Sequence, residues 1–162
     1  ACGASPESMR ETIHEFKGVE HRMEFVDEIN GVKFYNDSKA TSVDATLKAL
    51  EALSEGDGKV VLILGGRGKN APYEPLAPLI ENSVRKVVVI GEDAKNIRSQ
   101  LSKHAEIEHA GSFKEAVQRS FDSATTGDSV LLAPACASFD MFKSFEERGA
   151  VFKEEVRNLR RS

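Results

Sequence analysis

The chain has 162 residues, of which 40% are hydrophobic and 30% charged, so it is neither disordered nor collagen-like and is long enough to bury the core of one domain without a metal or disulfide. Lys and Arg number 22 and Asp and Glu 26, a net charge of −4 that argues against a sequence-independent grip on DNA or RNA. Small anionic ligands fit this composition, because a few backbone amides and one Lys can hold a phosphate.

The first 53 residues predict a helix, a β-hairpin and a second helix. Ser5 suits an N-cap position, and apolar side chains follow it at helical spacing. Two alternating runs then flank Asn30-Gly31, a pair that favours a two-residue turn with both residues at positive φ. A short polar segment precedes an apolar stripe of helical period. The expected elements are, in order, a helix over 6–16, strands over 23–29 and 32–35, and a helix over 43–53.

From Gly58 onward, short apolar runs alternate with helical patterns. Continuous apolar strands separated by crossover helices indicate a parallel sheet covered on both faces. One helical pattern opens with a capping box, Ser112 to Glu115. The expected strands are 60–64, 87–90, 107–110 and 130–133, and the expected helices are 74–82, 93–103, 112–126 and a last region that carries Phe142, Phe145, Phe152, Val156 and Leu159. We therefore expect a three-layer, Rossmann-like α/β domain with a mostly parallel sheet, helices on both faces and an antiparallel hairpin in front.

Ligands bind beyond the carboxyl ends of the strands in such a sheet, so the loops there are the candidate sites. Residues 65–69 read Gly-Gly-Arg-Gly-Lys, without Walker A or G-x-G-x-x-G spacing, yet the glycines permit close approach and Lys69 can meet a carboxylate or phosphate. Residues 37–41 precede a helix amino terminus, where free N–H groups attract anions, and Asp37 could accept from a sugar hydroxyl. The alternatives are a glycine-rich turn with a solvated Lys and a polar helix cap.

The loop 134–138 carries Cys136 and Ser138. No Gly-x-Ser-x-Gly elbow or recognisably spaced His accompanies Cys136, so a structural cysteine is favoured over a nucleophile, and Ser138 is better placed as a hydrogen-bond donor. Most phenylalanines of the last part of the chain, which are Phe139, Phe142, Phe145 and Phe152, are expected in the core. The two cysteines make no disulfide framework and the four histidines form no metal-ligand pair, so no metal site is expected. No apolar run reaches the roughly 18 residues of a membrane span, and no signal peptide is expected.

Four segments together are similar to one family in their order and spacing. They are His21-Arg22-Met-Glu-Phe, Asn36-Asp37-Ser38-Lys39-Ala40-Thr41, Leu64-Gly65-Gly66-Arg-Gly-Lys69 and the stretch from Leu132 to Gly149. The chain resembles the carboxy-terminal domain of the Mur ligases of bacterial peptidoglycan synthesis, and its Asp-Ser-Lys-Ala-Thr motif resembles the branch that adds D-glutamate. By this resemblance, residues 1–17 form the tail of a preceding central ATPase domain and residues 18–162 form the carboxy-terminal, D-glutamate-binding domain.

The resemblance implies ATP-driven amide bond formation in the bacterial cytoplasm, by a monomer that binds neither nucleic acid nor membranes. ATP would phosphorylate the terminal carboxylate of UDP-N-acetylmuramoyl-L-alanine, and the amine of D-glutamate would attack the acyl phosphate, releasing ADP and phosphate. The residues that the family would use for D-glutamate are Thr41, Lys69, Ser138 and Phe145. Those for the nucleotide are Arg22 at the phosphates, Asp37 at the ribose and Lys39 at the junction with glutamate.

The family's Walker A loop, magnesium ligands and modified lysine lie in its central domain, and its uridine nucleotide site lies in its amino-terminal domain. Because this chain has no Walker A motif, we expect it to be inactive alone, ATP and Mg²⁺ being used by a complete enzyme. Two alternatives stay open: a stand-alone nucleotide- or amino-acid-binding module, and a Cys136-dependent hydrolase or amidotransferase. Asn70 stands beside Lys69 where relatives carry an acidic residue nearby, which leaves the role of Arg67 open.

Overall fold

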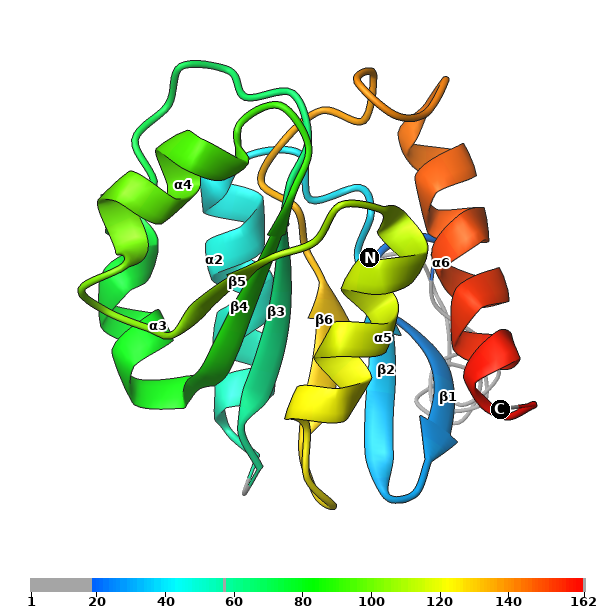
Figure 1. The fold of residues 1–162 in the computed structure, drawn as a ribbon. Helices are drawn as coiled ribbons and strands as arrows, with labels where there is room; N and C mark the ends of the chain where they lie inside the picture. The colour runs from blue at the N-terminus through cyan, green and yellow to red at the C-terminus, as the bar shows by residue number, and fades with distance from the viewer. Residues whose placement is uncertain (1–18, 57, 162) are drawn as a thin grey trace, which may run out of the picture.

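A computed structural model of the chain describes residues 19–56 and 58–161. Within them the chain forms one six-stranded sheet in the order β1-β2-β6-β3-β4-β5, in which β1 is antiparallel to β2 and the other neighbours are parallel (Figure 1). The strands are β1 (Glu24–Ile29), β2 (Val32–Asn36), β3 (Val60–Gly65), β4 (Val84–Ile90), β5 (Ile107–His109) and β6 (Ser129–Leu132). The helices are α2 (Val43–Ser54), the 3₁₀ turn η1 (Glu74–Leu76), α3 (Ala77–Ser83), α4 (Ala94–Leu101), α5 (Phe113–Ser123) and α6 (Phe145–Leu159). The expected α/β fold with a leading hairpin is confirmed.

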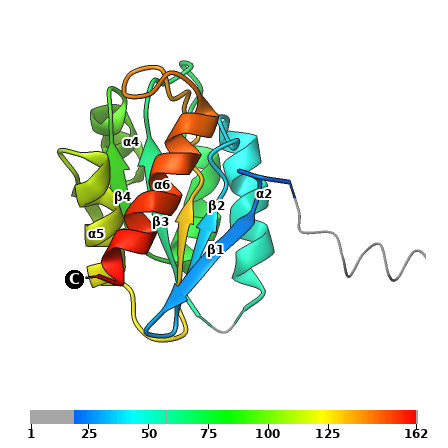
Figure 2. The same ribbon diagram turned by 90° about the vertical axis from the view of Figure 1, so that its right-hand side faces the viewer.

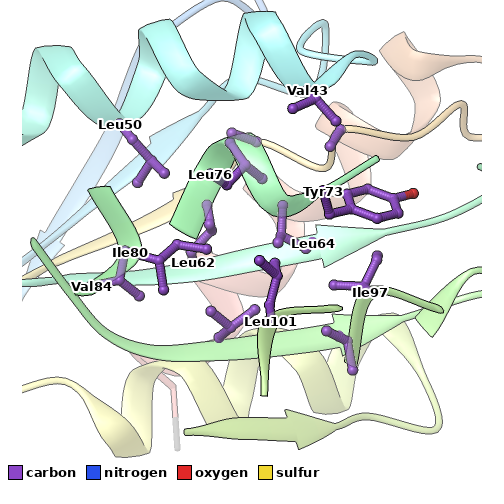
Figure 3. Packing of buried hydrophobic residues seen from close by; sticks show 14 of the residues in the cluster. Val43, Leu50, Leu62, Leu64, Tyr73, Leu76, Ile80, Val84, Ile97 and Leu101 are labelled. Atoms are coloured by element: carbon purple, nitrogen blue, oxygen red, sulfur yellow. The ribbon is translucent and has the colours of Figure 1, made fainter. Parts of the chain in front are cut away.

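Helices cover both faces of the sheet because the central strands are apolar on both sides. Leu62 and Leu64 of β3 pack under α2, α3 and α4, as Figure 3 shows, and Val61 and Ile63 pack under α5 and α6. Figure 2 shows α2 and α6 on opposite sides of the sheet. Each fully buried Leu or Ile contributes about 1.5–3 kcal/mol relative to an exposed one. The period-two alternation of side chains along a strand therefore stabilises three layers at once.

The hairpin and the helix starts follow their local signals. Asn30 (φ 53°) and Gly31 (φ 77°) form the two-residue turn between β1 and β2. Ser42 caps α2 by accepting from the Ala45 N–H, and Ser112 caps α5 by accepting from the Glu115 N–H. Each cap contributes about 1 kcal/mol.

The order of the strands brings three loops together. From β2 the chain crosses through α2 to β3, and the last strand, β6, fills the gap between them. The loops that follow β2, β3 and β6 therefore leave the same edge of the sheet side by side (Figure 1). Such a switch point is where open α/β sheets bind ligands.

Several expected boundaries were wrong. The helix expected over 112–126 ends at Ser123, because the Thr125 N–H is taken by the Asp128 carboxylate. The last helix begins only at Phe145, where Ser144 caps it, so Phe142 lies in the preceding loop. The segment 74–82 is divided into η1 and α3. Phe139 is 63% exposed rather than in the core. The helix expected over 6–16, and the domain tail expected over 1–17, lie outside the described residues.

Candidate functional site

The loops beyond β3 and β6 are bonded into one surface. Arg67 and Ala137 exchange both N–H···O bonds, at 2.9 and 3.0 Å, in an antiparallel bridge between these loops. The Ala135 N–H donates to the carbonyl of Ala40 at 2.9 Å, which adds the loop beyond β2. Lys69 and Ser138 therefore lie two residues and one residue, respectively, from a shared bridge.

The glycines of the loop 65–69 allow this close approach. Gly65 and Gly66 have φ values of 126° and 129°. A Cβ atom on Gly66 would stand 2.3 Å from the Ala137 carbonyl oxygen. The backbone of Gly66 also accepts from the Asp93 N–H and donates to the Ile90 carbonyl, both at 3.0 Å. The glycine-rich turn is therefore a rigid junction between the ends of three strands.

A cavity of about 350 Å³ lies between the turn before β1 and the start of α2. Its lining residues are Arg22, Met23, Asp37, Lys39, Ala40, Ala45, Lys48 and Ala49. All three residues predicted for the nucleotide are among them. Burial raises the pKa of the Asp37 carboxyl, against the opposing effects of the Met23 backbone N–H and the Arg22 charge. Cationic rims and a buried acceptor suit a ligand with phosphates and hydroxyls.

A strained turn holds Arg22 at this cavity. His21 and Met23, on either side of Arg22, have φ values of 63° and 43°, in the left-handed region. His21 is buried, with Nδ1 3.0 Å from the Asn36 side-chain nitrogen, and its carbonyl accepts from the Lys39 N–H at 3.1 Å. The turn therefore joins the Arg22 segment to the Asp37–Thr41 motif, which sequence reasoning did not foresee.

Of the four residues predicted for D-glutamate, two are in direct contact. Lys69 Nζ donates to Thr41 Oγ1 at 3.1 Å, although the residues are 28 positions apart. Lys39 Nζ lies 5.8 Å from the centre of the Phe145 ring, so the start of α6 faces the same motif. Ser138 is buried, and its carbonyl accepts from the N–H groups of two following residues of its loop. The structure thus brings Lys69 and Thr41 into contact and places Phe145 beside Lys39. Within residues 19–56 and 58–161, the Ser138 side chain forms no hydrogen bond with any of them.

One functional candidate was missed, the buried Arg148 of α6. It is 1% exposed and donates to Ser38 and to the Cys136 carbonyl. A signal was available: Phe145, Phe152 and Val156 define an apolar stripe at helical spacing, and Arg148 lies on that stripe. A charged residue on a core stripe indicates a specific partner.

Cys136 is held in a hydrogen-bonded trio. Its Sγ lies 3.0 Å from the hydroxyl of Tyr73, which donates to Asp93 Oδ2 at 2.5 Å. Burial raises the pKa of the Cys136 thiol to about 11, and burial and Asp93 raise the pKa of Tyr73 as well. A nucleophilic cysteine needs a lowered pKa, so this geometry supports the structural role. Tyr73 also packs among the core residues of Figure 3.

The remaining observations concern the partner of Arg67, metal ligands and membrane-spanning helices. Arg67 forms an ion pair with Glu92 at 3.0 Å on the exposed rim. Among residues 19–56 and 58–161, no group of three or more His, Cys, Asp or Glu side chains is arranged to hold a metal ion. In the same residues no helix is both long and apolar enough to cross a bilayer.

The family comparison agrees with this geometry. The family described as Mur ligase, glutamate ligase domain, matches residues 21–136, most of the chain. The chain belongs to this Mur ligase family.

Curated relatives extend the match over nearly all of the chain. The UDP-N-acetylmuramoylalanine–D-glutamate ligase of Thermoanaerobacter pseudethanolicus is 50% identical over 98% of this chain and 35% of its own length. The ligase of the same name from Koribacter versatilis is 48% identical over 98% of this chain and 34% of its own length. The chain therefore spans about a third of these Mur ligases.

Solved structures share the fold at low identity. Escherichia coli FolC in complex with DHPP and ADP is 18% identical, with a TM-score of 0.66 over 98% of this chain and 36% of that chain. The MurF ligase of Thermotoga maritima in complex with ADP is 18% identical, with a TM-score of 0.63 over 90% of this chain and 33% of that chain. These likenesses establish the Mur ligase fold.

The family match includes five of the seven predicted site residues. It begins at His21, next to Arg22, and ends at Cys136. Ser138 and Phe145 follow that end, within the part of the chain that the Mur ligase relatives match.

Proposed function

We propose that this chain is the D-glutamate- and nucleotide-binding domain of an ATP-dependent ligase of the bacterial cytoplasm, a monomer that joins D-glutamate to UDP-N-acetylmuramoyl-L-alanine. One observation carries the proposal. Asp37, Lys39 and Ala40 line the cavity beside Arg22, and the next residue along the chain, Thr41, contacts Lys69, in a chain that is 50% identical to a ligase with this name.

The cavity suits the nucleotide. Arg22 is exposed at its rim and can meet phosphate oxygens as they gain charge, for which a guanidinium is well suited. Asp37 can accept from ribose hydroxyls. Lys39 lines the cavity and also lies beside Phe145, so it would stand at the junction of the two ligands.

The Lys69–Thr41 pair suits a carboxylate. Because Thr41 Oγ1 already accepts from Lys69, its own hydroxyl proton and the remaining ammonium protons are free to be donated. D-glutamate has a second carboxylate, which Ser138 and the N–H groups at the start of α6, at Phe145, would bind. These contacts would hold the amine toward the acyl phosphate that ATP forms on the alanine carboxylate; attack expels phosphate and leaves the amide.

The remaining chemistry belongs to parts of the ligase that this chain does not contain. The chain spans 35% of the Thermoanaerobacter relative, and its sequence has no Walker A motif. The donor set of the cavity, two Lys, one Arg and one Asp, fits phosphate and ribose rather than a divalent cation. We therefore assign Mg²⁺ to the other domains.

A hybrid enzyme tests this function. This chain replaces the matching 35% of the Thermoanaerobacter pseudethanolicus ligase, and ADP release is measured with ATP, the UDP-linked alanine substrate and D-glutamate. We expect turnover that depends on D-glutamate, and a KM for D-glutamate raised about tenfold or more by Lys69→Met, since the cation that would meet the substrate carboxylate is lost. The exposed Lys103, in the turn that follows α4, supplies the matched control Lys103→Met. A folded hybrid without D-glutamate-dependent turnover would overturn the proposal.

An amide-shift titration of this chain alone separates the stand-alone binding module from the ligase domain. We expect weak binding of D-glutamate and of ADP, with shifts at Lys69, Thr41 and Ser138, because the domains that would close over both ligands are absent. Tight binding without those domains would favour the stand-alone module. Shifts confined to the surroundings of Cys136 would favour neither.

A further inference from the structure

The buried guanidinium of Arg148 has three acceptors and, among the described residues, no carboxylate within ion-pair distance. Nε donates to Ser38 Oγ at 2.9 Å, Nη2 to the Ser38 carbonyl at 2.8 Å, and Nη1 to the Cys136 carbonyl at 3.1 Å. Burial lowers the pKa of Arg148 to about 10, so the side chain still carries its charge at neutral pH. Burying a cation without a carboxylate partner is destabilising, and these charge-assisted hydrogen bonds oppose that cost.

The three acceptors belong to the two loops that carry the predicted ligand residues. Ser38 stands between Asp37 and Lys39, in the loop beyond β2. Cys136 is two residues before Ser138, in the loop beyond β6. A single side chain thus joins the nucleotide motif to part of the D-glutamate site, 98 residues further along the chain.

Ser38 completes the connection. Its hydroxyl accepts from Arg148 and donates to the Phe145 carbonyl at 2.7 Å. That carbonyl belongs to the first turn of α6, the turn that precedes Arg148. The position of the Phe145 ring beside Lys39 is therefore set by the same pair of side chains.

The loop beyond β3 also lies against Arg148. A Cβ atom on Gly66 would stand 3.3 Å from Nη1, so the guanidinium fills the space beside that glycine. Three ligand loops consequently share one rigid support. All three guanidinium nitrogens are in use and the residue is 1% exposed, so Arg148 cannot itself touch a ligand in this geometry.

We propose that Arg148 is a positioning residue for D-glutamate: it sets the spacing between the 37–41 and 136–138 segments, so that Lys69, Thr41 and Ser138 meet one amino acid together. The inference rests on the proposed ligase function. A planar guanidinium reaches acceptors on both loops at once, whereas the single ammonium of a lysine cannot. Removing Arg148 should displace these groups by about 1 Å, and displacements of that size cost about 100-fold.

The test uses the hybrid ligase with four variants: Arg148→Lys, Arg148→Met, Ser38→Ala and, as the matched control, Arg157→Met in the exposed part of the same helix. Each is assayed at least 10 °C below its own measured unfolding midpoint, so that lost folding does not enter the kinetics. We expect kcat/KM for D-glutamate to fall about 100-fold in Arg148→Met and less in Arg148→Lys, mainly through KM. Ser38→Ala, which leaves the guanidinium both carbonyl acceptors, should fall about tenfold, and Arg157→Met should be unchanged.

The outcomes separate the two proposals. An inactive, folded wild-type hybrid overturns the ligase function and the inference with it. An active wild-type hybrid whose folded Arg148→Lys and Ser38→Ala variants keep KM for D-glutamate within twofold overturns the inference alone, since a purely structural role lowers only the unfolding midpoint. If both Arg148 variants fail to fold, Ser38→Ala decides: a raised KM supports the inference, and an unchanged one refutes it.

Discussion

Asp128 lies just before β6, at the amino-terminal ends of the parallel strands and therefore opposite the site. Its contacts allow a stability prediction to be worked out. The carboxylate is buried and accepts five hydrogen bonds from Lys59, Arg85 and Thr125. The shortest joins Arg85 Nε to Oδ2 at 2.6 Å. Asp128→Asn replaces one acceptor oxygen by an NH₂ donor, which leaves Arg85 or the Thr125 N–H without a partner.

The magnitude follows from the pKa. Burial alone would raise it, but Arg85, Thr125 and Lys59 lower the pKa of Asp128 from 3.8 to about 2. At about 1.36 kcal/mol per pH unit, the ionised carboxylate contributes about 2.5 kcal/mol to the free energy of unfolding. Because the folded-state pKa is lowered, this contribution is complete above pH 4 and is lost as the pH falls: about 1 kcal/mol by pH 3 and about 2 kcal/mol by pH 2.

Urea denaturation of this chain and of Asp128→Asn, at pH 7, 5, 3 and 2, measures both numbers. We expect the variant to be less stable by about 2–4 kcal/mol at pH 7, and the difference to shrink by about 2 kcal/mol at pH 2. Asp122→Asn, on an exposed residue of α5, is the control and should stay within about 0.5 kcal/mol at every pH. A difference between wild type and Asp128→Asn that does not change with pH would refute the reasoning.

Three further predictions concern the site and the chain as a whole. Gly66→Ala should lower the free energy of unfolding, measured by urea denaturation, by about 2 kcal/mol or more, because the new Cβ would stand 2.3 Å from a backbone oxygen at a φ of 129°. The control Gly56→Ala, whose Cβ would have no atom nearer than 3.6 Å, should cause no such loss. Equal losses in the two variants would contradict this prediction. In the folded protein, iodoacetamide should alkylate Cys136 about 100-fold more slowly than a free thiol, since burial raises the pKa of Cys136 from 9.0 to about 11. Mass spectrometry of the resulting peptides measures the rate. Rapid modification at pH 8 would support the nucleophile hypothesis. This chain alone should release no phosphate from ATP in a coupled assay, and steady turnover would show that the ligase chemistry does not need the missing domains.

Much of the fold could be predicted because its signals are local. The run Val60–Leu64 is too short for a helix and too apolar for a surface, and Asn30-Gly31 tolerates the positive φ of a tight turn. The positions of these elements in the sequence were therefore predictable. Their ends were less so: α5 stops at Ser123 because Asp128, which lies beyond it in the chain, captures the Thr125 N–H.

The candidate site was predictable residue by residue, through motifs, but not as an arrangement. Lys69 and Thr41 each belong to a recognisable loop, yet their 3.1 Å contact exists only because β2 and β3 lie in one sheet, on either side of β6, with their carboxyl ends at the same side. Arg148 shows the limit most clearly. Its neighbours Glu146 and Glu147 read as a solvated helix surface, and nothing nearby in the sequence identifies its acceptors.

The sequence by itself determined which segments become strands and helices, which turns are tight, and which residue types are available to meet anions. The tertiary structure alone decided the order of the strands, the cavity beside α2 and the burial of Arg148 against Ser38 and Cys136. The reason is physical. Turn and cap preferences act over a few residues, whereas the free energy of burying a side chain, and the acceptors that make a buried charge tolerable, depend on groups brought together from distant parts of the chain.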